Sequence, residues 1–104
     1  MTAPVTHPPL ACVIIPTYNE VENIGPLLEA IRRLDAPERL RIIVVDDSSA
    51  DGTADRVREA ASRLGGIELI ERPAKLGLGT AFVAGFSLAY QTRKSFAVPR
   101  SDAD

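Results

Sequence analysis

The stretch Leu40-Arg-Ile-Ile-Val-Val-Asp-Asp-Ser-Ser-Ala-Asp-Gly52 decides how this 104-residue chain folds. Its first part, Leu40 to Val45, is short and rich in β-branched residues, which is typical of a strand buried in a parallel sheet. It ends on two carboxylates, Asp46 and Asp47, and a turn that closes on glycine. In open α/β sheets, ligands bind beyond the carboxyl ends of the strands, so this loop is the first candidate site.

Two further strands are predicted on either side of this stretch. Ala11 to Ile15 is an uninterrupted apolar run stopped by Pro16, which predicts a strand buried on both faces. Ile67 to Ile70 predicts a third short strand. The polar loop from Pro16 to Glu20 follows the first strand directly and is the second candidate site.

Three helices are predicted by apolar residues that recur at spacings of three and four. We expect Asn19 to cap the first helix, Asp51 or Thr53 to cap the second, and Gly65 and Gly66 to end the second. The apolar positions are Val21, Ile24, Leu27, Leu28, Ile31 and Leu34, then Ala54, Val57, Ala61 and Leu64, and finally Phe82, Phe86 and Ala89.

The resulting order β-α-β-α-β-α predicts an α/β fold: a parallel sheet with right-handed crossovers and helices packed on its faces. We expect residues 1–10 to be a flexible lead-in and residues 11–104 to form a single folded unit. The apolar runs are far shorter than the ~20 residues that span a bilayer.

Composition excludes several classes of function. The formal net charge is −2, which gives no basic field suited to a nucleic-acid backbone, so no nucleic-acid partner is expected. The one cysteine, Cys12, is expected to be buried and rules out a disulfide within the chain, which fits a reducing compartment. His7 has no neighbours that suggest a metal or a nucleophile site.

Adjacent carboxylates at a strand end repel each other unless something uses them, so Asp46 and Asp47 favour a ligand role for at least one of the pair. Capping of the turn by Asp46 and Asp51 is the alternative. An EF-hand loop starting at Asp47 fails because its twelfth position is Arg58. A receiver-type phosphoacceptor stays open as a weaker alternative.

The glycines Gly77 and Gly79 precede the third helix. A dinucleotide fingerprint is disfavoured because Phe82 stands where its third glycine belongs. Anion binding at the helix N-terminus and a loop without a ligand remain as alternatives. The flanking Arg72 and Lys75 are expected to be solvated.

Three blocks of the sequence together resemble the dolichol-phosphate mannosyltransferase family. They are Val13-Ile-Ile-Pro-Thr-Tyr-Asn-Glu20, Ile43-Val-Val-Asp-Asp-Ser-Ser-Ala-Asp-Gly-Thr53 and Glu71-Arg-Pro-Ala-Lys-Leu-Gly-Leu-Gly-Thr-Ala-Phe-Val-Ala-Gly85. The first two are shared by many inverting glycosyltransferases of the GT-A fold, and the third is typical of the dolichyl or polyprenyl phosphate mannose synthases. The resemblance covers residues 11–90. It implies that residues 11–104 are the nucleotide-sugar-binding front part of an incomplete, Rossmann-like GT-A domain, truncated at or near its metal motif.

The resemblance also implies a reaction and its site residues. Mannose would pass from GDP-mannose to dolichyl or polyprenyl phosphate, with the donor held by Pro16, Tyr18, Glu20, Val45 and Asp47. The family's Asp-Ala-Asp motif corresponds to Asp102, Ala103 and Asp104, whose carboxylates would act in catalysis by holding Mg²⁺ or Mn²⁺. Pro99 and Arg100 interrupt the apolar strand that precedes this motif in the family, so an unrelated chain end stays open as an alternative.

A lipid phosphate acceptor is already anionic near neutral pH, because its second pKa is ~6, so the reaction needs no strong general base. We expect a cytoplasmic location, with peripheral contact at the membrane face left open, and no turnover by residues 1–104 alone. A noncatalytic nucleotide-binding or regulatory module, and a related transferase using UDP-glucose, are the competing interpretations.

Overall fold

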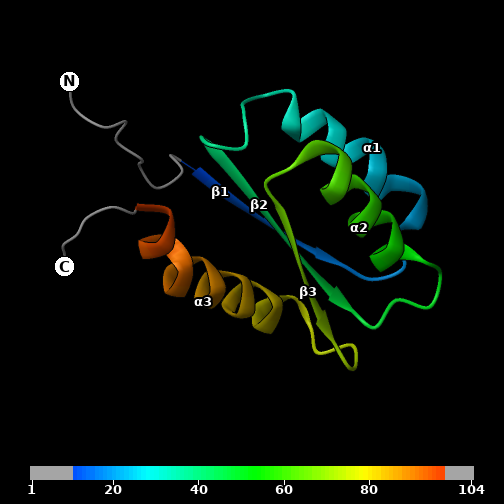
Figure 1. The fold of residues 1–104 in the computed structure, drawn as a ribbon. Helices are drawn as coiled ribbons and strands as arrows, with labels where there is room; N and C mark the ends of the chain where they lie inside the picture. Colours follow the sequence, from blue (N-terminus) through cyan, green and yellow to red (C-terminus); the bar gives the residue numbers. More distant parts are fainter. Residues whose placement is uncertain (1–10, 98–104) are drawn as a thin grey trace, which may run out of the picture.

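The computed structural model describes residues 11–97, with their side chains through residue 92. Three parallel strands form one sheet in the order β1-β2-β3, and a helix follows each strand. The elements are β1 (Ala11–Thr17), α1 (Val21–Arg32), β2 (Leu40–Asp47), α2 (Thr53–Leu64), β3 (Ile67–Arg72) and α3 (Leu78–Ala97). Helices α1 and α2 cover one face of the sheet and α3 covers the other (Figure 1). The predicted parallel α/β fold is therefore confirmed for these residues.

Strand β2 is the centre of the structure, and all eight of its residues are buried. Alternate side chains of a strand point to opposite faces of the sheet. Ile42 and Val44 pack beneath α1 and α2, whereas Ile43 and Val45 pack beneath α3. This two-sided burial explains why Ile42 to Val45 is a continuous apolar run rather than an alternating one.

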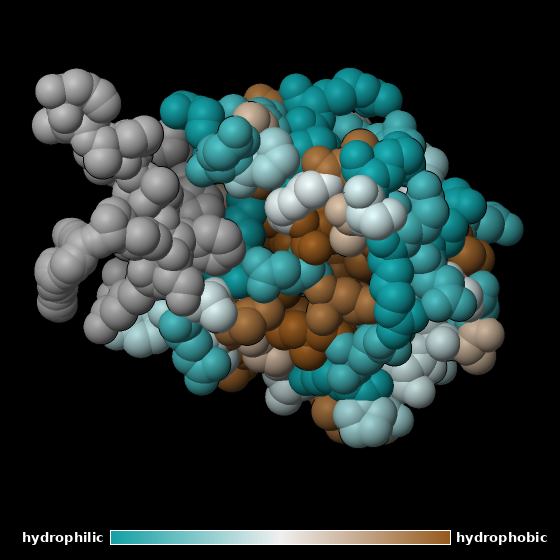
Figure 2. Space-filling view, viewed as in Figure 1, coloured by the Kyte–Doolittle hydropathy of each residue, from teal (hydrophilic) through white to brown (hydrophobic). Residues whose placement is uncertain are grey.

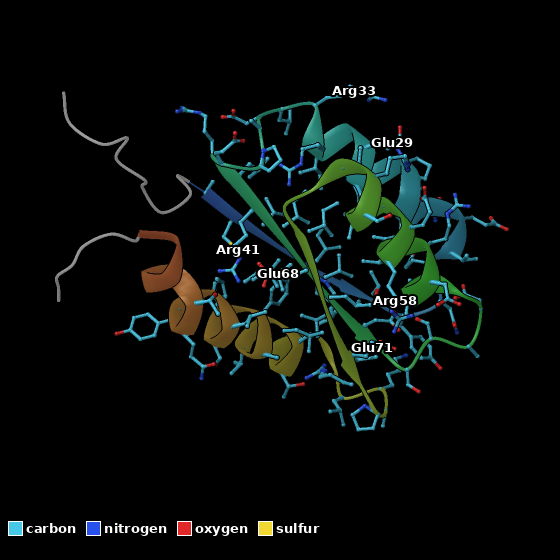
Figure 3. The ribbon with its side chains drawn as sticks, in the orientation of Figure 1. Glu29, Arg33, Arg41, Arg58, Glu68 and Glu71 are labelled. Atoms are coloured by element: carbon cyan, nitrogen blue, oxygen red, sulfur yellow. The ribbon has the colours of Figure 1, made fainter. Side chains whose placement is uncertain are left out.

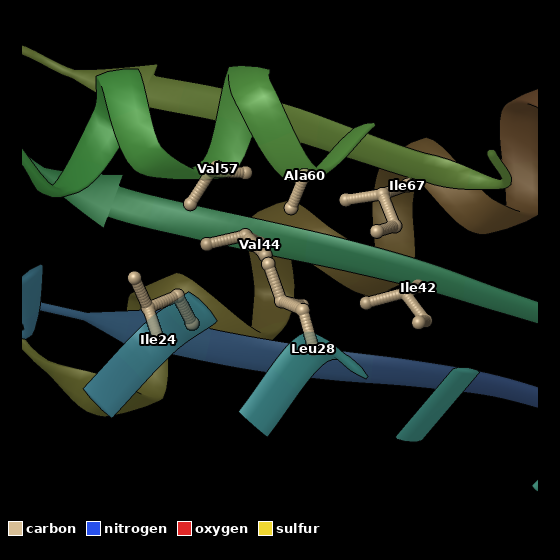
Figure 4. Close-up of a cluster of buried hydrophobic side chains, with 7 residues drawn as sticks. All are labelled: Ile24, Leu28, Ile42, Val44, Val57, Ala60 and Ile67. Carbon is tan, nitrogen blue, oxygen red and sulfur yellow. The ribbon is translucent and has the colours of Figure 1, made fainter. Parts of the chain in front are cut away.

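The larger core lies between the sheet and the α1–α2 layer (Figure 4). Side chains from both helices meet on top of β2, and Leu28, Val44 and Val57 are fully buried. The cluster consists of Ile24, Leu28, Ile42, Val44, Val57, Ala60 and Ile67. The helical spacing that predicted α1 and α2 is thus the spacing of the buried face.

Strand β1 corrects one prediction. It pairs with β2 alone among the described strands, so it is an edge of this sheet. Its two faces are both covered in part, since Ile15 packs against the cluster beneath α1 and α2 and Ile14 against the cluster beneath α3. Cys12 is exposed, contrary to expectation, while Val13 to Pro16 are half-buried. An apolar run cannot distinguish an edge strand from a central one, because strand order is set by tertiary pairing.

Helix α3 corrects a second prediction. Phe82 and Phe86, expected on the buried face, are 39% and 62% exposed, and small residues face the sheet instead. A Cβ built on Gly85 would come within 2.5 Å of Ile14 Cγ2, so the helix lies very close to β1. Ala89 does pack, as predicted, against the buried cluster of Ile43, Val45 and Ala81 between the sheet and α3.

Two leucines of the first predicted helix also lie outside the core. Leu27 is 43% exposed, and Leu34, which follows the end of α1, is 77% exposed.

Figure 2 shows hydrophobic residues gathered in the middle of one face, with hydrophilic residues around them. Within residues 11–97, no helix has the length and the apolar character needed to cross a bilayer.

Candidate functional site at the carboxyl ends of the strands

The parallel register brings the predicted donor-binding residues to one edge of the sheet. Pro16 lies opposite Val45, and Asp47 lies opposite Arg72. Tyr18 follows β1 directly and is 43% exposed. Residues from all three candidate blocks therefore meet where the strands end, which is where ligands bind in open α/β sheets.

The loops after β1 and β2 are bonded to each other through main-chain N–H groups. The Asn19 N–H donates to Ser49 Oγ at 2.7 Å, and the Ala50 N–H donates to Asn19 Oδ1 at 3.0 Å. Asn19 adopts a left-handed backbone, with φ of 55°. Asparagine tolerates this conformation better than most residues, and the reciprocal bonds hold it there.

The main-chain N–H groups at the start of α1 donate to side chains that lie just after β2 in the chain, and this corrects the predicted cap. The N–H groups of Glu20 and Val21 donate to Thr53 Oγ1 at 2.9 Å and Asp51 Oδ2 at 3.2 Å. Asn19 does not cap the helix; its N-cap residue is Glu20, without a side-chain cap of its own. Asp51 Oδ1 also accepts from the Thr53 N–H at the start of α2, but the N-cap residue of that helix is Gly52, without a side-chain cap.

Asp46 has a structural role. Its carboxylate accepts from Thr17 Oγ1 at 2.6 Å, from the Ser49 N–H at 3.0 Å and from Ser49 Oγ at 2.6 Å. Only 2% of the residue is exposed. Asp46 therefore closes its own turn and joins it to β1, which is the capping alternative that the sequence left open.

Asp47 is held differently, by a bidentate ion pair. Arg72 Nε donates to Asp47 Oδ1 at 2.6 Å and Arg72 Nη2 donates to Oδ2 at 2.9 Å, while the Leu76 N–H donates to Oδ2 at 3.0 Å. The two side chains are 8% and 10% exposed for Asp47 and Arg72. The Arg72 guanidinium holds the pKa of the Asp47 carboxyl below its usual range, so the group is a carboxylate at neutral pH.

The prediction that Arg72 is a solvated side chain is wrong. Its guanidinium reaches across the sheet to Asp47 and also donates to Thr80 Oγ1 and to the Gly77 carbonyl oxygen. The sequence contained one usable signal: aligned parallel strands would place Arg72 beside the end of β2. Loop composition alone does not reveal this, since it gives no register.

The remaining side chains at this edge are more open. The Lys75 ammonium lies 4.6 Å from the centre of the Tyr18 ring, a cation–π contact that joins the loop after β1 to the loop after β3. Gly77 has φ of 99°, and neither Gly77 nor Gly79 has any atom within 4 Å of where a Cβ would stand. The edge is therefore open above the start of α3.

The other predicted site residues differ in how far a ligand can reach them. The Val45 side chain is fully buried beneath α3, so only its main chain faces the strand ends. Glu20 is exposed, and its Oε1 accepts from Asn23 Nδ2 at 3.3 Å. Asp102, Ala103 and Asp104 lie outside the described residues, and within residues 11–97 no group of three or more His, Cys, Asp or Glu side chains could hold a metal ion.

Two curated relatives of this chain carry names that refer to polyprenyl phosphates or polyprenol phosphomannose. An undecaprenyl-phosphate mannosyltransferase of Micrococcus luteus is 42% identical over 73 residues, which are 70% of this chain and 29% of the relative. A polyprenol monophosphomannose synthase of Mycolicibacterium smegmatis is 39% identical over 93 residues, 88% of this chain and 34% of the relative. The chain thus spans about a third or less of the curated relatives that it matches.

A solved structure matches the fold as well. A mannosyltransferase from Pyrobaculum calidifontis, in complex with GDP-Man and Mn²⁺, superposes with a TM-score of 0.70 at 31% identity, covering 83% of this chain and 28% of that one. The GT-A fold class expected from the resemblance is thereby confirmed for the matched residues. The model of glycosyl transferase family 2 matches residues 12–104. This chain therefore belongs to glycosyl transferase family 2.

Proposed function

We propose that this protein takes part in the transfer of mannose from GDP-mannose to a polyprenyl or dolichyl phosphate. The observation that carries the proposal is the fixed Asp47 carboxylate at the end of β2, beside the exposed Tyr18 ring. The names of the relatives and the GDP-Man complex of the matched structure support the choice of donor and acceptor.

The site offers a nucleoside two kinds of contact. The Asp47 carboxylate accepts three hydrogen bonds, from Arg72 Nε, Arg72 Nη2 and the Leu76 N–H. A carboxylate offers roughly four acceptor sites, so a ligand N–H or O–H can take the remaining one in competition with the Gly77 N–H. The exposed Tyr18 ring provides an apolar surface at the same edge. Pro16, Glu20 and the main chain of Val45 complete the proposed nucleoside site.

We further propose that Asp102 and Asp104 hold a divalent metal ion, as Mg²⁺ or Mn²⁺, with Ala103 between them. Such an ion would supply charge stabilisation to the departing diphosphate. The acceptor phosphate brings its own negative charge, so the residues of this chain need only bind and orient the donor. Contact with a membrane surface would follow from a lipid acceptor and is part of the same proposal.

Calorimetric titration of GDP-mannose and UDP-glucose into the chain tests the nucleoside site. We expect selective binding of GDP-mannose and its loss in Asp47→Asn. Asp55→Asn is the matched control, because the Asp55 side chain is 86% exposed on α2 and pairs with Arg58 rather than with a residue of the proposed site. Preference for UDP-glucose would change the donor, and a folded chain that binds neither would contradict the proposal and favour a noncatalytic module.

A transfer assay tests the reaction itself. Residues 1–104 alone, supplied with GDP-mannose, a polyprenyl phosphate and magnesium, should give no radiolabelled mannosyl lipid, and product from them would overturn that expectation. Calorimetry with and without Mn²⁺ tests the metal ligands: Asp104→Asn should weaken the metal-dependent part of GDP-mannose binding without weakening folding. Equal metal dependence in that variant would contradict the proposed metal ligands.

A further inference from the structure

Arg72 is the most connected side chain at the candidate site. Its three guanidinium nitrogens all donate: Nε to Asp47 Oδ1, Nη2 to Asp47 Oδ2 and the Gly77 carbonyl, and Nη1 to Thr80 Oγ1. The planar guanidinium holds these donors in a fixed fork, which a lysine ammonium cannot reproduce. A single residue of β3 therefore sets the orientation of a carboxylate on β2.

The same contacts fix the glycine-rich loop. Thr80 Oγ1, held by Arg72, also donates toward the carbonyl oxygens of Leu76 and Gly77. The Leu76 N–H donates a hydrogen bond to Asp47 Oδ2 at 3.0 Å. The end of β2, the end of β3 and the start of α3 thus form one hydrogen-bonded unit with Arg72 at its centre.

We propose that Arg72 is the positioning residue of the nucleoside site: it orients Asp47 so that Oδ1 meets the nucleoside, and it holds the loop at Gly77 beside it. Arg72 need not touch the donor, because its guanidinium nitrogens are already engaged with protein acceptors. This inference rests on the proposed function, in which Asp47 binds the nucleoside.

The chain supplies its own matched control for the test. Arg41 and Glu68 form a second bidentate pair between β2 and β3, at 2.5 Å and 2.7 Å, near the opposite end of the sheet (Figure 3). Arg41 is 4% exposed, so its loss removes a buried pair comparable to that of Arg72. A general loss of stability would affect both variants, whereas a positioning role affects only one.

The experiment is titration of GDP into the wild type, Arg72→Met, Arg72→Lys and Arg41→Met, each checked for folding by circular dichroism. We expect Arg72→Met to weaken GDP binding about tenfold or more, which corresponds to the loss of about one charged hydrogen bond. Arg72→Lys should weaken it by a similar factor despite keeping the charge, and Arg41→Met should change it less than about twofold.

A pH series separates positioning from simple destabilisation. Arg72 is the main cause of the low pKa of Asp47, so Arg72→Met should raise the pH below which GDP affinity falls. Arg41→Met should leave that pH unchanged. If Arg72→Met does not fold, the loss of affinity in Arg72→Lys decides the matter.

Two results would overturn the inference. One is a folded Arg72→Met or Arg72→Lys variant that binds GDP as tightly as the wild type. The other is equal weakening in the Arg72 and Arg41 variants. A wild-type chain that is folded and binds no GDP would instead refute the proposed function on which the inference rests, so the two failures are distinct.

Discussion

The two ends of the β2–β3 pair carry the same kind of interaction with the charges exchanged. Near the amino ends, Arg41 of β2 pairs with Glu68 of β3, and at the carboxyl ends Asp47 of β2 pairs with Arg72 of β3. Each pair is bidentate and contains a buried guanidinium, although Glu68 is more exposed to water than Asp47. Their chemistry alone therefore does not tell which of them belongs to a functional site.

The surroundings of the two pairs differ. Asp47 is flanked by the turn of Asp46, by the loop of Tyr18 and by the start of α3. The parallel order of the strands places every strand-to-helix loop at that end, so polar groups accumulate there. Position at the strand ends, rather than the ion pair itself, therefore supports the proposal that Asp47 binds the nucleoside.

Removing the carboxylate from each pair gives the largest expected effects. Asp47→Ala leaves the buried Arg72 guanidinium without its counter-ion and should lower the free energy of unfolding by about 3 kcal/mol. Glu68→Ala should lower it by about 2 kcal/mol, because the Glu68 side chain is 35% exposed and water partly replaces it. Urea unfolding measures both.

Nucleotide binding then distinguishes the two ends. Asp47→Ala should abolish detectable GDP binding, while Glu68→Ala should leave the dissociation constant unchanged within about twofold. Equal loss of binding in folded samples of both variants would contradict the assignment of the site to one end of the sheet.

Acid should weaken the fold through the Asp47 end. Because the folded-state pKa of Asp47 is depressed, its contribution to stability is present above the unfolded value of about 3.9 and is lost as pH falls through the lower folded value. Urea unfolding at a series of pH values below about 4 should show this loss. In Asp47→Asn the fall should be shallower; an unchanged slope would show that other carboxylates, such as Asp51, dominate.

Two glycines with positive φ test the loop at a smaller scale. Gly77→Ala and Gly65→Ala should each cost about 1 kcal/mol, since φ of 99° and 78° disfavour a side chain. A Cβ has open space at Gly77 and only an ordinary contact with Pro37 at Gly65, so backbone strain is the main cost in both. Gly77→Ala alone should weaken GDP binding, because Gly65 lies at the other end of α2.

Two threonines of α3 give the smallest expected effect. Thr80→Val removes a hydroxyl that accepts from Arg72 and should cost about 1 kcal/mol with a modest loss of GDP affinity. Thr92→Val removes a hydroxyl that donates only to the Leu88 carbonyl and should cost less than about 1 kcal/mol with no change in affinity. Equal effects on affinity would show that the Thr80 contact does not support the site.

Local sequence patterns predicted most of the fold because its core follows helical and strand periodicity. Spacing identified Ile24, Leu28 and Val57, the many β-branched residues identified Leu40 to Val45, and all of these are buried. The errors of burial depend on which element lies next to a residue, and they concern Cys12, Leu27, Leu34, Phe82 and Phe86. Periodicity shows that a face is apolar but not whether a neighbour covers it.

The sequence by itself determined the order of elements, the polar loops after β1 and β2, and the family, because these depend on residues close together along the chain. Only the tertiary structure decided between Asp46 and Asp47: the first closes its own turn, and the second faces Arg72 across the sheet. The physical reason is register. Asp47 and Arg72 are 25 residues apart in sequence and become neighbours only when β2 and β3 align, so no local pattern could pair them.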